Sequence, residues 1–215
     1  MNGSCIRRCA LVAAMLFGLV ASGTASGLTI YDVDNAVSIP DPGEVFTTFT
    51  VAGEGSIIVD VNVRIAIDHP LVEDLDVMLM SPAGTTVELF SDLLIGDFSA
   101  MHFQDTLLDD GAAVAITAGS APFIGSYRPE GSLADFNGEN PNGVWTLFVE
   151  DDQLLPFGDQ TVLAAGDTAP WGDAVGTQLM IEARDPSRVI PEPIAATLSL
   201  MGLSALGVHV RRRRI

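Results

Sequence analysis

The chain contains no lysine, and its ten basic side chains, all arginines, stand against 28 aspartates and glutamates. Every acidic residue lies between Asp32 and Glu192, a segment with a net charge of −24 that holds only four bases: Arg64, Arg128, Arg184 and Arg188. A protein that neutralises nucleic-acid phosphates needs a basic surface. The charge distribution therefore excludes a nucleic-acid partner, whereas it suits solubility, salt tolerance or divalent cations.

Cysteine is also scarce, because Cys5 and Cys9 are the only two in the chain. Arg7 and Arg8 precede the apolar run "ALVAAMLFGLV" and the small residues "ASGTASG", a layout typical of a secretory signal peptide. We predict a signal peptide over residues 1–27 that signal peptidase removes between Gly23 and Gly27. The exported protein would then have no cysteine and would be stable without disulfides.

Long apolar runs are confined to the two ends of the chain. The second run, 194–210, is 17 residues long, which is the short end of what spans a bilayer as a helix. Four arginines follow it directly, and the positive-inside rule keeps them cytoplasmic with the acidic part outside. We therefore predict a folded domain over residues 28–188 and a C-terminal segment, 189–215, that contains a transmembrane helix.

The middle of the chain predicts an all-β fold. In "SIIVDVNVRIAID" (56–68) a period-two alternation places Val59, Val61, Val63, Ile65 and Ile67 on one face of a half-buried strand. Shorter runs of the same kind recur at 45–51, 74–80, 85–90, 112–116, 144–150 and 177–183, with Gly, Pro, Asp and Asn between them. Residues 154–176 are Gly- and Asp-rich, which predicts a loop with one short strand near Val162. Seven to nine short strands indicate an antiparallel β-sandwich or jelly roll.

Two stretches carry a family resemblance. "IDHPLVEDLDVMLMSPAGTTVELF" (67–90) and "YRPEGSLADFNGENPNGVW" (127–145) resemble the P domain, also called P/Homo B, of the subtilisin-like proprotein convertases. The resemblance extends over about residues 50–183. The family pattern falls on His69, Asp74, Leu75, Ser81, Pro82, Gly84 and Thr85, and further along on Tyr127, Arg128, Pro129, Glu130, Gly131, Phe136, Asn137, Gly138, Asn142, Gly143 and Trp145. Residues 152–176 depart from that pattern, and Trp171 stands where an insertion has displaced the family's tryptophan.

The C-terminal segment resembles the PEP-CTERM sorting signal of Gram-negative bacteria, which an exosortase-type enzyme recognises and processes. The motif falls on Pro191, Glu192 and Pro193, and the closing arginines are Arg211, Arg212, Arg213 and Arg214. The two prolines keep Ile190 and Glu192 out of helical geometry, so an extended peptide is presented just outside the membrane. The resemblance implies export to the cell envelope or exterior of a Gram-negative-type bacterium.

Histidine is too scarce for an evident catalytic site. A serine protease needs a nucleophile, a base and a group that orients the base, and the chain has only His69, His102 and His209. Neither His69 nor His102 lies near a nucleophile motif, and the chain has no room for the family's catalytic domain. We therefore expect no enzymatic activity, and we expect His69 to be a turn residue bonded to local backbone.

Two binding chemistries remain open on the sequence. Acidic clusters at loops or strand ends are suited to structural calcium, for which the first candidates are Asp74, Asp105, Asp109 and Asp110; a plain solvated acidic surface is the alternative. Aromatic residues Phe123, Tyr127, Phe136 and Trp145 raise a glycan site, although the alternation around Trp145 indicates core packing.

These observations predict a non-catalytic exported sandwich module with a binding or structural role. A surface polymer or surface protein is the first candidate partner. The resemblance also implies an alternative, an accessory module that stabilises a separate subtilisin-like serine endopeptidase, and a lectin-like glycan binder is the second alternative.

Overall fold

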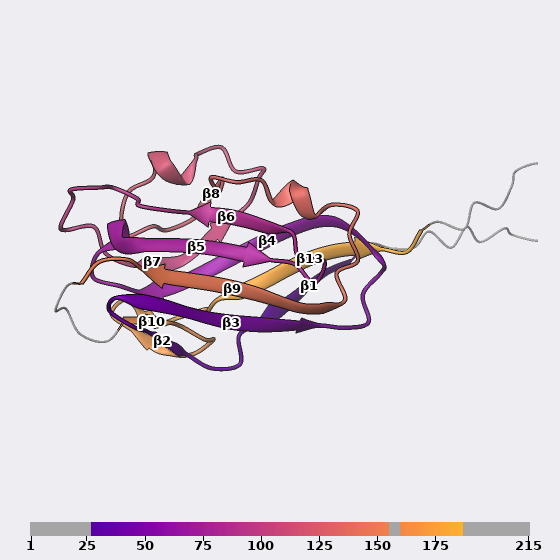
Figure 1. Cartoon of the computed structure of the whole chain (residues 1–215), viewed down its shortest axis with the longest axis horizontal. Helices are drawn as coiled ribbons and strands as arrows, with labels where there is room; N and C mark the ends of the chain where they lie inside the picture. Colours follow the sequence, from indigo (N-terminus) through magenta and orange to yellow (C-terminus); the bar gives the residue numbers. More distant parts are fainter. Residues whose placement is uncertain (1–26, 155–159, 187–215) are drawn as a thin grey trace, which may run out of the picture.

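The computed structural model describes residues 27–154 and 160–186, and these residues form an all-β fold (Figure 1). The predicted signal peptide, except Gly27, and the predicted tail from residue 189 lie outside the described residues. Within the described part of the chain, no helix is long and apolar enough to cross a membrane. The predicted fold class, an antiparallel β-sandwich, is confirmed.

Two sheets form the layers of the sandwich. The front sheet in Figure 1 has four strands in the order β3-β9-β5-β6: β3 (Gly43–Val51), β9 (Gly143–Asp151), β5 (Leu75–Met80) and β6 (Thr86–Phe90). The larger sheet has the order β1-β13-β4-β10-β2, with β7 beside β4 and β8 beside β7. Its strands are β1 (Gly27–Asp32), β13 (Gln178–Arg184), β4 (Ile57–Asp68), β10 (Gln160–Val162), β2 (Val37–Ile39), β7 (Phe103–Leu108) and β8 (Ser126–Tyr127).

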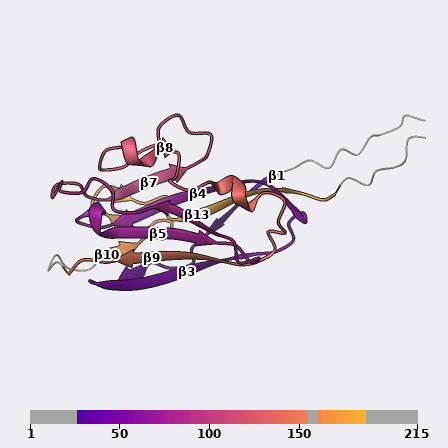
Figure 2. The ribbon, with the colours of Figure 1, turned by 45° about the horizontal axis from the view of Figure 1, so that its top comes forward.

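The remaining elements are short. A two-stranded hairpin, β11 (Thr168–Ala169) and β12 (Gly172–Asp173), stands apart from the two sheets. Three 3-10 helices are η1 (Val72–Asp74), η2 (Ile116–Ala118) and η3 (Leu133–Phe136). All strand pairs are antiparallel except β7 with β8. Figure 2, turned by 45°, shows β7 and β8 above the layer of β4 and β13.

Strand β4 follows the predicted alternation over most of its length. Val61, Val63, Ile65 and Ile67 are buried between the sheets. Val59 is the exception, because β13 pairs Asp60 with Glu182 and Ile58 with Ala183, and Val59 is left without a partner in a β-bulge. The bulge turns Ile58 into the core and leaves Val59 38% exposed, so the predicted inward position of Val59 is wrong.

The core is aromatic around β9. Trp145 is fully buried, packs edge-on against Phe136 with ring centroids 5.0 Å apart, and donates its indole N–H to the carbonyl of Pro141 at 2.8 Å. Phe90, Phe103 and Phe123 form a second stack, with successive centroids 4.4 and 5.0 Å apart. The predicted core role of Trp145 is confirmed.

Three sequence expectations need correction or extension. Residues 112–116 form no strand; Ala115 makes a single bridge to Arg128, and η2 follows, which accords with the low strand propensity of alanine. The segment 154–176 contains β10 at the predicted place around Val162, and also the unpredicted hairpin β11–β12. Strands β1, β2, β7 and β8 had no predicted counterpart.

The bulge in β4 generates a matched test. Val61→Thr places a hydroxyl in the core and should lower the free energy of unfolding by about 1–3 kcal/mol. Val59→Thr places the same hydroxyl in solvent and should change it by less than about 0.5 kcal/mol. Urea unfolding of both variants checks the expectation, and equal losses in the two would contradict the bulge.

Candidate functional site

The first family stretch forms a braced turn. In "SPAGT" (81–85) the amide of Ser81 donates to the carbonyl of Thr85 at 2.9 Å, and Gly84 takes a positive φ of 90°. The hydroxyls of Ser81 and Thr85 both donate to the carboxylate of Glu139, the former at 2.6 Å. A single glutamate of the second family stretch therefore holds the turn of the first.

Other residues of the family pattern also have structural roles. Gly143 lies so close to Pro82 that a Cβ there would stand 2.7 Å from the proline ring, and a Cβ on Gly131 would meet the carbonyl oxygen of Glu88 at 2.7 Å. The side-chain oxygen of Asn142 accepts the amide of Glu54 at 3.0 Å. The backbone of Arg128 bonds on both sides of Ala115. The residues predicted from the family pattern therefore mark contacts that shape the loops.

His69 occupies a buried turn, as predicted, and it also has a partner on the other sheet. Its Nδ1 accepts the amide N–H of Leu71 at 3.2 Å, so the proton resides on Nε2, which donates to Oδ2 of Asp151 at 3.2 Å. Both side chains are 1% exposed. Burial raises the pKa of Asp151 although the bond from His69 opposes that shift. The pair links the end of β4 to the end of β9, and its burial keeps it from any substrate.

Asp74 lies close to this pair, and its carboxylate is buried and has a raised pKa. The residue is only 3% exposed. Burial, and after it the carboxylates of Asp151 and Glu73, raise the pKa of Asp74 to about 6. Asp41 and Asp152 add to the same effect. Negative charge is therefore concentrated at this end of the sandwich.

A cleft of about 430 Å³ opens beside Asp74, and we name it the end cleft. It is lined by Glu73, Asp74, Asp92, Ile95, Phe98 and Gln153. Ile95 and Phe98 are each 78% exposed. The carboxylate of Glu73 accepts the amide of Gly96, which ties η1 to the loop that carries the two apolar side chains. The end cleft thus combines carboxylates with exposed apolar surface.

A second cleft, the side cleft, lies beside β7 and β8. It has a volume of about 460 Å³, and its lining includes Arg64, Gln104, Asp105, Ile124, Ser126 and Trp171. The guanidinium of Arg64 is oriented by the Gln178 side chain at 3.1 Å and the Asp105 carbonyl at 3.3 Å. The tip of the β11–β12 hairpin supplies Trp171, so the segment that departs from the family pattern builds part of this cleft.

The structure does not gather the four residues predicted for calcium into one cluster. Asp110 accepts the amides of Leu133 and Ala134, Asp109 accepts the amide of Gly111, and Asp105 accepts those of Val175 and Gly176. Asp74 is in the end cleft. Among the described residues, no group of three or more His, Cys, Asp or Glu side chains is arranged to hold a metal ion. Three of the four carboxylates therefore fix loops, and calcium binding stays a prediction.

No pattern in the sequence indicated the pair formed by His102 and Asp68. Nδ1 of His102 lies 3.0 Å from Oδ1 of Asp68, and the imidazole ring packs against Trp171 with centroids 5.4 Å apart. Burial lowers the pKa of His102 in spite of the neighbouring carboxylate. His102 has a positive φ of 64°, a property of backbone geometry that periodicity does not reveal.

The comparisons with known proteins identify the module. A family model described as the proprotein convertase P-domain matches residues 58–161. The chain contains a P domain. The match is shorter than the resemblance predicted over 50–183, and it leaves β3 and β13 outside. The P domain is a non-catalytic module associated with subtilisin-like proteases.

Two solved structures are similar over part of their length. Both contain the serine protease of Aeromonas sobria, one alone and one in complex with a chaperone. Each match covers 74% of this chain at 20% sequence identity, with a TM-score of 0.40 for the protease alone and 0.41 for the complex. The match spans only 26% of the protease chain in the structure of the protease alone and 27% of the matched chain in the complex. No curated protein matches the chain.

The brace at Glu139 generates a prediction on stability. Glu139→Gln keeps the shape of the side chain but removes the charge that two hydroxyls bind, and it should cost about 1–3 kcal/mol in the free energy of unfolding. Glu130→Gln is the matched control, because that carboxylate accepts one exposed hydroxyl bond from Ser91 at 3.2 Å. Its cost should stay below about 0.5 kcal/mol. Chemical denaturation compares the two, and an unaffected Glu139→Gln variant would refute the brace.

Asp74 generates a prediction on pH. Its pKa of about 6 lies above the ordinary value of 3.8, so the folded state holds this proton more tightly than the unfolded chain. The group therefore disfavours folding above about pH 6, and this penalty is relieved as the pH falls toward about 4. Asp74→Asn should raise the free energy of unfolding at about pH 7 by about 1–3 kcal/mol and leave it unchanged near pH 4.

The exposed Asp135 supplies the control for this pH series. Asp135→Asn should leave the free energy of unfolding within about 0.5 kcal/mol at both pH values. Thermal or urea unfolding across the pH range gives the measurement. A loss of stability in Asp74→Asn at neutral pH would show that the charged carboxylate is favourable in the folded domain.

Proposed function

We propose that this P domain is a non-catalytic binding module that is exported and sorted to the cell envelope or exterior. A signal peptide over residues 1–27 directs export, and the PEP-CTERM segment, 189–215, directs sorting in a Gram-negative-type bacterium. The transmembrane helix at 194–210 holds the chain in the inner membrane until an exosortase-type enzyme acts at Pro191, Glu192 and Pro193.

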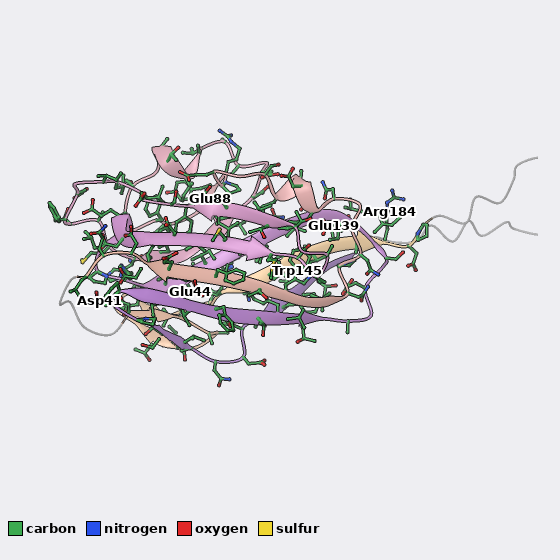
Figure 3. All side chains as sticks on the ribbon, in the orientation of Figure 1. Asp41, Glu44, Glu88, Glu139, Trp145 and Arg184 are labelled. Atoms are coloured by element: carbon green, nitrogen blue, oxygen red, sulfur yellow. The ribbon has the colours of Figure 1, made fainter. Side chains whose placement is uncertain are left out.

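One structural observation carries the proposal. Gly27 pairs with Ala183, so the chain enters and leaves the described domain at one end. Figure 3 places Arg184, the last residue of β13, at that end, with Asp41 and Glu44 toward the opposite end. A domain tethered by its C-terminal segment therefore presents its acidic end, with the end cleft, away from the membrane.

A glycan ligand remains the second candidate, but on a different residue from those expected. Phe123, Phe136 and Trp145 are fully buried, which removes three of the four predicted aromatic contacts. Trp171, by contrast, lines the side cleft together with Arg64 and Asp105. Aromatic and polar side chains in one open cleft favour a saccharide. Retention on a glycan array that Trp171→Ala abolishes would favour this alternative.

The accessory role beside a separate subtilisin-like protease is the remaining proposal, and it rests on the family alone. Co-purification of the chain with such a protease from cell envelopes would favour it. In that case the surface polymer or surface protein proposed as partner is replaced by the protease.

The sorting proposal is tested at the mature C-terminus. Mass spectrometry of the exported protein should find a chain that ends near Pro191 to Pro193, because the two prolines present an extended peptide to the processing enzyme. Substitution of both prolines by alanine should leave the tail in place, since the segment could then continue as helix. Detection of Arg214 on the exported native protein would instead identify a lasting membrane anchor.

A further inference from the structure

The outer face of the front sheet carries a row of like charges. Glu44 lies directly opposite Glu150, and Glu150 lies directly opposite Asp76, across the three adjacent strands β3, β9 and β5. Directly opposed residues project to the same face, and like charges so placed destabilise a sheet. A row of three carboxylates therefore costs stability unless a cation is bound beside it.

No described residue supplies that cation. The two ion pairs among the described residues are His69 with Asp151 and His102 with Asp68. Arg184 lies at the opposite end of the domain from Glu44 (Figure 3), the guanidinium of Arg64 lines the side cleft, and that of Arg128 donates to the carbonyl of Ala112. One carboxylate oxygen of Asp76 is buried without a hydrogen-bond partner in the described part of the chain. The charge of the row is left uncompensated by these residues.

The acidic row continues into the end cleft. Asp92, which lines the cleft, lies close enough to Asp76 to raise its pKa, after burial, which is the larger cause. Asp74 lines the cleft although the residue is only 3% exposed. An ionised carboxylate with so little contact with water is costly, and a cation that enters the cleft reduces that cost.

Apolar side chains accompany the carboxylates at both places. The next cross-strand row consists of Phe46, Phe148 and Met78, with Phe46 60% exposed and its ring centroid 6.4 Å from that of Phe148. In the end cleft, Ile95 and Phe98 are the apolar side chains that lie beside the carboxylates. A bare metal ion gains nothing from such contacts, whereas an arginine-bearing peptide does, because its stem and neighbours are apolar and its guanidinium stacks on aromatic rings.

The loop that presents Ile95 and Phe98 has strained backbone. Four described residues other than glycine have positive φ, and all lie in 92–105: Asp92, Leu94, His102 and Asp105. Leu94, with φ of 61°, has no side-chain hydrogen bond to favour this conformation. Such strain persists where the surrounding structure imposes it, and it clusters at binding sites.

We propose that the end cleft and the adjoining acidic row bind a segment of a partner protein that carries both arginines and apolar residues. The proposal rests on the binding role proposed above and names the class of partner. Arginine reaches Asp74 and Asp92 in the cleft, apolar neighbours pack on Phe98 and Ile95, and a further arginine neutralises the row at Glu150.

The test uses the purified full-length chain and a synthetic peptide, acetyl-Ala-Arg-Leu-Arg-Leu-Arg-Ala-amide, followed by calorimetry or fluorescence anisotropy. We expect binding that weakens as salt is raised. Peptides with glutamate in place of arginine, or with serine in place of leucine, should bind at least about tenfold more weakly. If the serine peptide binds as well as the leucine peptide, the surface attracts charge alone and the proposal is overturned.

Matched variants locate the site. The double variant Asp74→Asn with Asp92→Asn should weaken binding about tenfold, and Phe98→Ser about threefold. Asp135→Asn and Ile124→Ser, which alter an exposed carboxylate and a residue 61% exposed in the side cleft, should leave binding unchanged. Equal losses in these controls would overturn the assignment to the end cleft.

Calcium separates the peptide from a metal ion as the occupant. At constant ionic strength, calcium chloride should leave peptide binding unchanged, and displacement of the peptide by calcium would overturn the proposal in favour of a metal site. Failure of the peptide to bind leaves export and sorting standing, since those are read from the mature C-terminus. Retention of Arg214 on the exported protein, conversely, leaves the binding result intact.

Discussion

The buried hydrogen bond between His69 and Asp151 fixes the acidic end of the domain. It joins the turn that follows β4, in the larger sheet, to the last residue of β9, in the front sheet. The same imidazole accepts the amide of Leu71, and the carbonyl of His69 accepts the amide of His102. These contacts determine where η1 begins and where β7 starts. The positions of Asp74 and of the loop that carries Phe98 follow from them. A neutral histidine satisfied on both nitrogens therefore organises a region that is otherwise a concentration of negative charge.

Excess negative charge is the constraint under which this fold operates. Two devices reduce its effect. Backbone amides donate to several carboxylates, as at Asp105 and Asp110, and these hydrogen bonds both stabilise the negative charge and fix the loops. Elsewhere a carboxylate takes hydroxyl donors, as Glu139 does from Ser81 and Thr85. Neither device operates along the row of Glu44, Glu150 and Asp76, and the acidic end differs from the rest of the domain in this respect.

The sequence predicted the parts of the fold that repeat and missed those that depend on distant contacts. Alternation located β4 and β9, but it could not reveal the bulge at Val59, because that bulge is defined by the register of β13. Strand β1 gave no signal, since it is an edge strand that leaves Leu28 and Ile30 exposed. The family pattern fell on His69 and Asp74, but it could not reveal the partner of His69, which lies 82 residues away in β9. The end cleft could not be predicted for the same reason, because Asp92, Ile95 and Phe98 line it only together with residues of η1 that are distant in the sequence.

The pairing of β1 with β13 has a consequence for the timing of folding. The first described strand, Gly27–Asp32, has its partner in the last, Gln178–Arg184, so the larger sheet cannot be completed until nearly the whole domain has been made. Contacts of such large sequence separation form late and slowly. A chain that is threaded across a membrane from its N-terminus must remain unfolded during passage. For the export route proposed above, the position of the closing strand at the end of the domain means that the larger sheet is completed only after nearly all of the domain has crossed the membrane.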